Sequence, residues 1–262
     1  MPSSLIRRGG WYLLELRLLL QHFICQVLQK NDFVDNFKQE VFKALNGIAT
    51  LDWSIANKSA EYRGAELLRE SQLYHGYDNV IEDDKLRTFH QFATIDVCEL
   101  KAHMELRNEP VRTIFKGFIA RVKVRKPFSG ATYVQTEKDG SVIDSGSGGL
   151  FDSRDDITET ELEWGEFERF LKIKSSDPTE ARQIFTPDFM AVLYDWWRTH
   201  DKPLRLSFRE QAIYIGFPTV IDLEPILIGN LDNERPVVRD VLEFMLMLKE
   251  LIRILVEKQG WE

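Results

Sequence analysis

The stretch EWGEFERFLKIKSSDPTEARQIFTPDFMAVLYDWWRTHDKPLRLSFREQAIYIGF, from Glu163 to Phe217, contains the strongest fold signals in the chain. Asp177-Pro178 and Thr186-Pro187 are both helix-start signatures, because Asp and Thr side chains accept backbone N–H groups and proline suits the first helical position. They predict a short helix that ends near Phe185 and a second helix that runs to about His200. No residue in the stretch has a reactive setting, so it indicates a fold without indicating a chemistry.

Details of the same stretch extend this prediction. Glu180 stands three residues after Asp177, a spacing that predicts a capping box. The second helix has apolar residues at steps of three and four, which predicts one buried face: Phe189, Val192, Leu193, Trp196 and Trp197. Apolar residues then alternate from Leu204 to Phe217 around Arg209-Glu210-Gln211, which predicts a hairpin with one buried side.

Upstream residues carry mostly strand patterns. The clearest long strand is expected over Val111–Lys126, two more over Leu86–Glu105, and another over Ala131–Thr136. Glu82, Asp83 and Asp84 are expected in a solvated turn. These patterns predict an α+β fold in which the helix pair Asp177–His200 covers one face of a mainly antiparallel sheet.

Long amphipathic helices are expected at both termini, over Trp11–Leu45 and Pro236–Lys258. Charged and polar residues interrupt the first helix too often for a membrane span. We therefore divide the chain into a helical segment 1–47, an α+β domain 48–235 and a C-terminal helix 236–262. The surplus apolar surface of the terminal helices favours self-association, a protein partner or peripheral membrane contact.

Within the central domain, residues 137–168 contain eleven acidic and two basic side chains, a local charge of about −9. With the Gly/Ser run 145–149, this composition predicts a flexible acidic loop.

Composition also limits the function classes. A formal net charge of −8 argues against nucleic acid as a partner. The two cysteines, Cys25 and Cys98, are expected as buried free thiols, which fits a reducing cytoplasm. The chain has no spacing typical of a metal site, a catalytic nucleophile or a phosphate-binding loop, so we expect no cofactor, no metal and no catalytic residue.

The best polar candidate is the basic strand. Alternation places Arg121, Lys123 and Arg125 on one face, where they are suited to contact anionic lipid or an acidic partner. A solvated sheet face, or a neighbour of the acidic loop, is the alternative interpretation.

Short motifs in order also carry a resemblance: Ser176-Asp177, Glu180-Ala181-Arg182, Phe185-Thr186-Pro187, Leu206-Ser207-Phe208 and Ile213-Tyr214-Ile215. Through them residues 80–227 resemble a mostly bacterial family catalogued as domain of unknown function 3137. That family has no settled activity, and its members commonly carry hydrophobic N-terminal segments with the shared domain on the cytoplasmic side. Together with the absence of catalytic motifs and the surplus apolar surface of the terminal helices, the resemblance favours a non-enzymatic binding or scaffold module in the cytoplasm or at the inner membrane surface. The alternative is an enzyme with an unrecognised site at the basic strand, covered by the acidic loop.

Overall fold

The computed structural model describes residues 53–55, 62–90, 93–105, 110–136, 157–162, 164–200, 203–218 and 234–258. Their elements in chain order are β1 (Trp53–Ile55), α3 (Gly64–Ser71), β2 (Asn79–His90), β3 (Ala93–Met104), β4 (Arg112–Lys123), β5 (Thr132–Thr136), β6 (Thr158–Glu159), α4 (Gly165–Glu168), β7 (Leu171–Ser175), α5 (Pro178–Ile184), α6 (Pro187–His200), β8 (Arg205–Arg209), β9 (Ala212–Pro218), α7 (Glu234–Ile252) and a π-helical turn, η2 (Arg253–Lys258).

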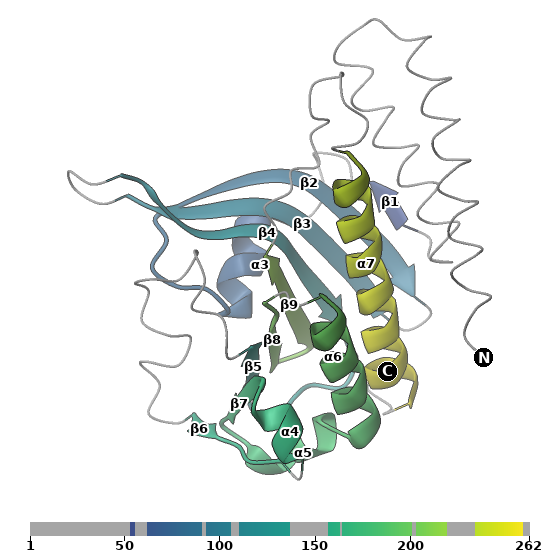
Figure 1. Ribbon diagram of the computed structural model, residues 1–262. Coiled ribbons are helices and arrows are strands. Elements are labelled where there is room, and N and C mark those ends of the chain that lie inside the picture. The colour runs from purple at the N-terminus through teal and green to yellow at the C-terminus, as the bar shows by residue number, and fades with distance from the viewer. Residues whose placement is uncertain are drawn as a thin grey trace, which may run out of the picture.

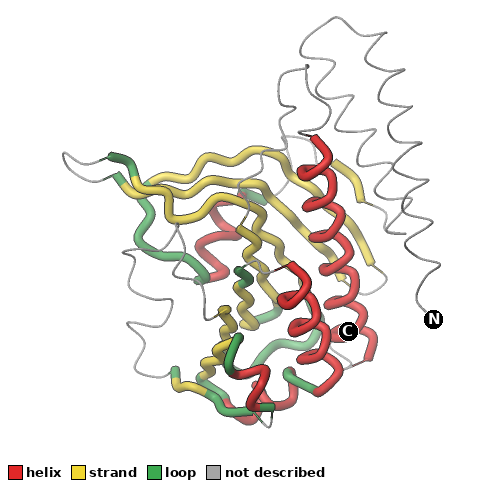
Figure 2. The backbone as a smooth tube through the Cα atoms, viewed as in Figure 1, coloured by secondary structure: helices red, strands yellow, loops and turns green. Residues whose placement is uncertain are grey.

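The described strands form one nine-stranded sheet in the order β1-β2-β3-β4-β9-β8-β5-β7-β6. Every described pairing is antiparallel, which confirms the predicted α+β class with a mainly antiparallel sheet. The predicted hairpin is β8–β9, with Arg209 paired to Ala212 across the turn. Figure 2 shows the long strands β2, β3 and β4, in yellow, extending beyond α6 and α7 toward the upper left.

Helices cover both faces of the sheet (Figure 1): α6 and α7 lie on one face and α3 on the other. The alternation of β4 explains the two cores. Phe118, Ala120 and Val122 belong to the larger apolar cluster, which includes residues of α5, α6 and α7. Ile119 belongs to a second cluster with Leu67 and Leu68 of α3. One strand thus contributes to both cores because successive side chains point to opposite faces.

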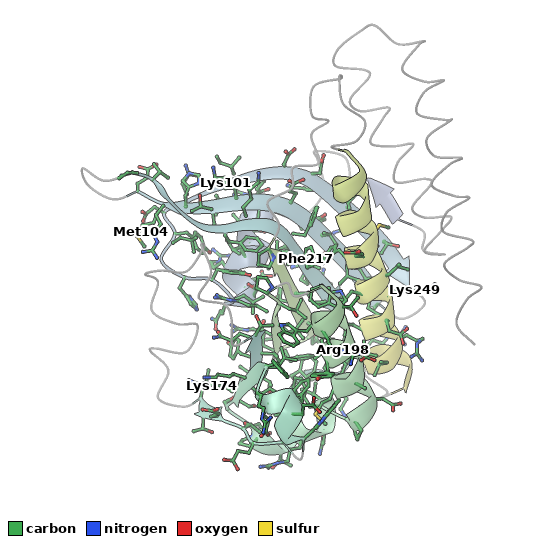
Figure 3. All side chains as sticks on the ribbon, viewed as in Figure 1. Lys101, Met104, Lys174, Arg198, Phe217 and Lys249 are labelled. Carbon is green, nitrogen blue, oxygen red and sulfur yellow. The ribbon has the colours of Figure 1, made fainter. Side chains whose placement is uncertain are left out.

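The predicted helix pair corresponds to α5 and α6. Phe189 and Leu193 of α6 are fully buried, and Trp196 and Trp197 are nearly so. Phe217, labelled in Figure 3, lies close to Trp196 of α6 and to Phe244 of α7. The apolar stripe read from the sequence is therefore the face that α6 buries against the sheet.

The C-terminal helix packs on this same core. Phe244 stacks on Phe118 of β4 with ring centroids 5.3 Å apart, and Leu248 and Leu251 are buried in the larger cluster. The predicted N-terminal helix Trp11–Leu45 lies outside the described residues. Among the helices that are described, none combines the length and the apolar character that a membrane crossing requires.

Three local expectations were wrong. Glu82, Asp83 and Asp84 lie in β2 and not in a turn, at a register shift between Glu82 and Lys85 where the pairing with β3 is irregular. Such an irregularity accommodates extra residues in a strand. The Glu82 carboxylate accepts the backbone N–H of Ala65 at 2.9 Å and pairs with Lys85 at 2.9 Å, so β2 is tied to the start of α3.

The other two errors concern residues 137–175. β6 and α4 lie inside the stretch 137–168 that was expected to be a loop, while residues 137–156 lie outside the described part of the chain. β7, with sequence LKIKS, was not predicted as a strand. Its lysines alternate with buried residues, but five residues give too short a pattern to separate it from the neighbouring helices.

Candidate functional site

A line of polar residues crosses the α3 side of the sheet. Following the strand register from β1 to β6, one residue of each strand stands in this line, which we call the polar row: Ser54, Arg87, Asp96, Arg121, Tyr214, Ser207, Tyr133, Lys174 and Glu159. All nine are polar, although a neighbouring row, in which Cys98 pairs with Ile119, contributes both residues to the second apolar core. The row therefore places directed interactions within an otherwise apolar interface.

Asp96 is the centre of the polar row and is completely buried. One carboxylate oxygen accepts Arg87 Nε at 2.6 Å, and the other accepts Arg121 Nη2 at 2.8 Å. Arg121 Nη1 also donates to Glu70 of α3 at 3.0 Å. Burial opposes the charge of Arg121, but the hydrogen bond and charge of Asp96 outweigh it and raise the pKa of the guanidinium. Arg121 is therefore held by two carboxylates.

The last turn of α3 rests on the same row. The Tyr214 hydroxyl donates to Glu70 at 3.2 Å, and burial together with the Glu70 charge raises the pKa of this phenol to about 12. The Ser207 hydroxyl donates to the Ser71 carbonyl at 2.7 Å, and the Tyr133 hydroxyl donates to the Gln72 side-chain oxygen at 3.0 Å. These contacts satisfy polar groups at the C-terminal end of α3, where the last carbonyl groups have no N–H partner within the helix.

The structure separates the three residues predicted as one basic face. Arg121 keeps only 12% of its side chain exposed and is bound within the polar row. Lys123, at the end of β4, and Arg125, just after it, are both exposed. The predicted row is therefore one buried structural arginine followed by two accessible cations.

A third cation joins them from the hairpin. In the row next to Arg121, Lys123 is paired with Ala212, and Ala212 with Arg209. We call Lys123, Arg125 and Arg209 the basic end. Arg209 Nη2 lies 3.2 Å from the exposed Glu210 carboxylate, whereas its Nη1 is buried and has no hydrogen-bond partner among the residues that the structure describes. A buried donor without an acceptor costs about 1–3 kcal/mol of folding free energy.

Backbone contacts hold the basic end together. The Val124 N–H donates to the Gln211 carbonyl at 3.0 Å, and the Phe128 N–H donates to the Glu210 carbonyl at 2.7 Å. Glu210 has φ 53°, a left-handed conformation that is uncommon for a residue with a side chain. The hairpin turn is thus fixed against the end of β4. Sequence spacing did not reveal Arg209 as a neighbour of Lys123, because strand order, and not chain order, brings them together.

The thiol of Cys98 is free and fully buried. Burial, reinforced by the Glu82 charge, raises the pKa of this thiol to about 12. A Cβ at Gly64 would stand 2.5 Å from Cys98 Sγ, so α3 packs closely on it. Cys98 is a core thiol and is protonated at neutral pH. In the part of the chain that the structure describes, no group of three or more His, Cys, Asp or Glu side chains is arranged to hold a metal ion.

Comparisons with known proteins add a family and a distant likeness. The family model "Protein of unknown function (DUF3137)" matches residues 113–256. No curated protein matches the chain. Among solved structures, the chain is similar to the mycobacterial trehalose monomycolate transport factor A, TtfA, with 7% identity and a TM-score of 0.37 over 80% of this chain and 95% of that one. At that score the likeness carries no argument about function.

Proposed function

The chain belongs to this family of unknown function, the DUF3137 proteins, and from that premise we propose a non-enzymatic binding module that recognises an anionic partner through its basic end. The observation that carries the proposal is a contrast along one sheet face between a paired arginine and two exposed cations. Arg121 is neutralised by Asp96 and Glu70, while Lys123 and Arg125 remain exposed beside it. Exposed cations on a rigid sheet attract and orient an acidic surface.

The enzyme alternative receives less support. Its candidate carboxylates, Asp96 and Glu70, are both engaged by Arg121, and the Cys98 thiol is buried with a raised pKa. An activated nucleophile needs the opposite, a lowered pKa or an adjacent base.

Contact through the terminal helices is a second element of the proposal. Leu246 of α7 is 42% exposed on a helix that otherwise buries its large apolar side chains where they are described. Together with the apolar N-terminal sequence, this supports self-association or binding of a protein partner. Sedimentation of the full chain at several concentrations tests it: the apparent mass is expected to rise with concentration and to do so less in Leu246→Asp.

We propose that the module lies in the cytoplasm, with peripheral contact at the inner membrane surface as the alternative. The free thiol of Cys98 supports a reducing compartment, where cysteines are usually unpaired.

The basic-end proposal is tested by site-specific photocrosslinking in the native host. A photoreactive residue at exposed Gln211 is expected to yield a discrete adduct with another molecule. The same residue at Lys101, an exposed lysine on the opposite side of the sheet, is the matched control. Equal yields from both positions, or no adduct from Gln211, would count against the proposal.

A further inference from the structure

The basic end has the charge and spacing of an oxyanion site. We infer that it binds a phosphate group as a dianion, held between Arg209 and Lys123. This inference rests on the proposed function and deepens it by naming the chemical class of the ligand.

The placement comes from the strand register. Arg209, Ala212 and Lys123 stand side by side on β8, β9 and β4. Neighbouring strands are about 4.8 Å apart, so the backbones of the two cations are roughly 10 Å apart. Ala212 contributes only a methyl group between them. The two cations therefore flank one small residue, at a separation that their long side chains can span to contact one phosphate group.

Arg209 supplies the directed contact. Its Nη1 is buried and lacks a hydrogen-bond partner in the described part of the chain, while Nη2 is shared with Glu210, whose side chain is 77% exposed. A phosphate oxygen accepts N–H groups of a guanidinium in the planar geometry that arginine presents. The turn that carries Arg209 is fixed by the Phe128–Glu210 backbone contact, so this donor is positioned before a ligand arrives.

Charge decides between phosphate and carboxylate. The basic end carries three positive charges, and Glu210 subtracts one, which leaves +2. The adjacent group is neutral, because Arg87 and Arg121 balance Asp96 and Glu70. A phosphate monoester carries nearly two negative charges at neutral pH, whereas a carboxylate carries one. The local charge therefore matches the phosphate.

Inorganic phosphate is the probe for the test, added to the full chain at pH 7.5 and followed by amide chemical shifts, with ionic strength held constant by sodium chloride. Saturable shifts are expected at residues 123–125 and 209–212. Arg209→Gln is expected to weaken binding roughly tenfold or more, since one charge-assisted hydrogen-bonding group is lost. Lys101→Gln is the matched control and is expected to bind as the wild type does.

Equal shifts in chloride alone, or unchanged affinity in Arg209→Gln, would overturn the inference. Arg209→Lys retains the charge without the planar fork and is expected to bind with intermediate affinity, which gives a second readout if Arg209→Gln fails to fold.

The source of the phosphate is distinguished with vesicles. Co-sedimentation with phosphatidylcholine vesicles that contain phosphatidic acid, and its loss in Arg209→Gln, would identify a lipid headgroup. Phosphate binding without vesicle binding would identify a soluble phosphate or a phosphorylated molecule. Binding to neither probe overturns the inference, while crosslinking from Gln211 reports separately on the proposed function.

Discussion

Asp96 balances two arginines from a fully buried position, so the fold is expected to be sensitive to the loss of its charge. Asp96→Asn keeps the size of the side chain but removes the charge that Arg87 and Arg121 require. Breaking a buried ion pair typically costs about 3–5 kcal/mol. We expect a loss of about 3 kcal/mol in the free energy of unfolding, measured by urea denaturation.

The control for this prediction is Glu210→Gln, which removes a carboxylate with 77% of its side chain exposed. Surface pairs of this kind contribute little, so the change is expected to stay below about 1 kcal/mol. Similar losses in both variants would show that Asp96 is not the centre of the network.

Cys98 contributes to the loss of stability in alkaline solution. Its pKa rises from 9.0 in the unfolded chain to about 12 in the native one, so the unfolded thiol loses its proton first as pH increases. The contribution of this thiol to stability is therefore complete below pH 9 and is lost between pH 9 and 12. The free energy of unfolding is expected to fall over that window, and to fall less steeply in Cys98→Ala. Equal slopes for the two proteins would contradict the assignment.

At the scale of elements, α5 is attached to the β4–β5 connection by the carboxylates of Asp177 and Glu180. Asp177 caps α5 as predicted, accepting the N–H groups of Thr179 and Glu180. These N–H groups and the Ser129 hydroxyl lower the pKa of Asp177. The predicted capping box is wrong, because the Glu180 carboxylate accepts the N–H groups of Ser129 at 2.7 Å and Gly130 at 2.9 Å instead.

Glu180→Ala is therefore expected to destabilise the protein by about 1.5–3 kcal/mol, since hydrogen bonds to a charged group are lost from a buried side chain. Glu159→Ala, at an exposed position of β6, is the control. Thermal unfolding of the two variants measures the difference. If Glu180 acted only as a local cap, its loss would cost no more than an ordinary cap residue, about 1 kcal/mol.

The capping residue also shows what the sequence can and cannot predict. Asp177 was identified because its partners are two and three residues away, within reach of local rules. Glu180 was misassigned because its partners lie fifty residues upstream, on a connection that tertiary packing brings to it. The same reason explains the basic face: alternation predicted Lys123 and Arg125, but only the strand order revealed Asp96 beside Arg121 and placed Arg209 two strands from Lys123.

Across the whole molecule, the sheet face under α3 divides into a structural polar row and an accessible basic end. The most direct test is the yield of the Gln211 photoadduct in a Lys123→Gln, Arg125→Gln chain, with the free energy of unfolding measured in parallel. The adduct yield is expected to fall several-fold while the free energy of unfolding changes by less than about 1 kcal/mol, because Lys123 and Arg125 are both exposed. Unchanged adduct yield in a stably folded chain would contradict it.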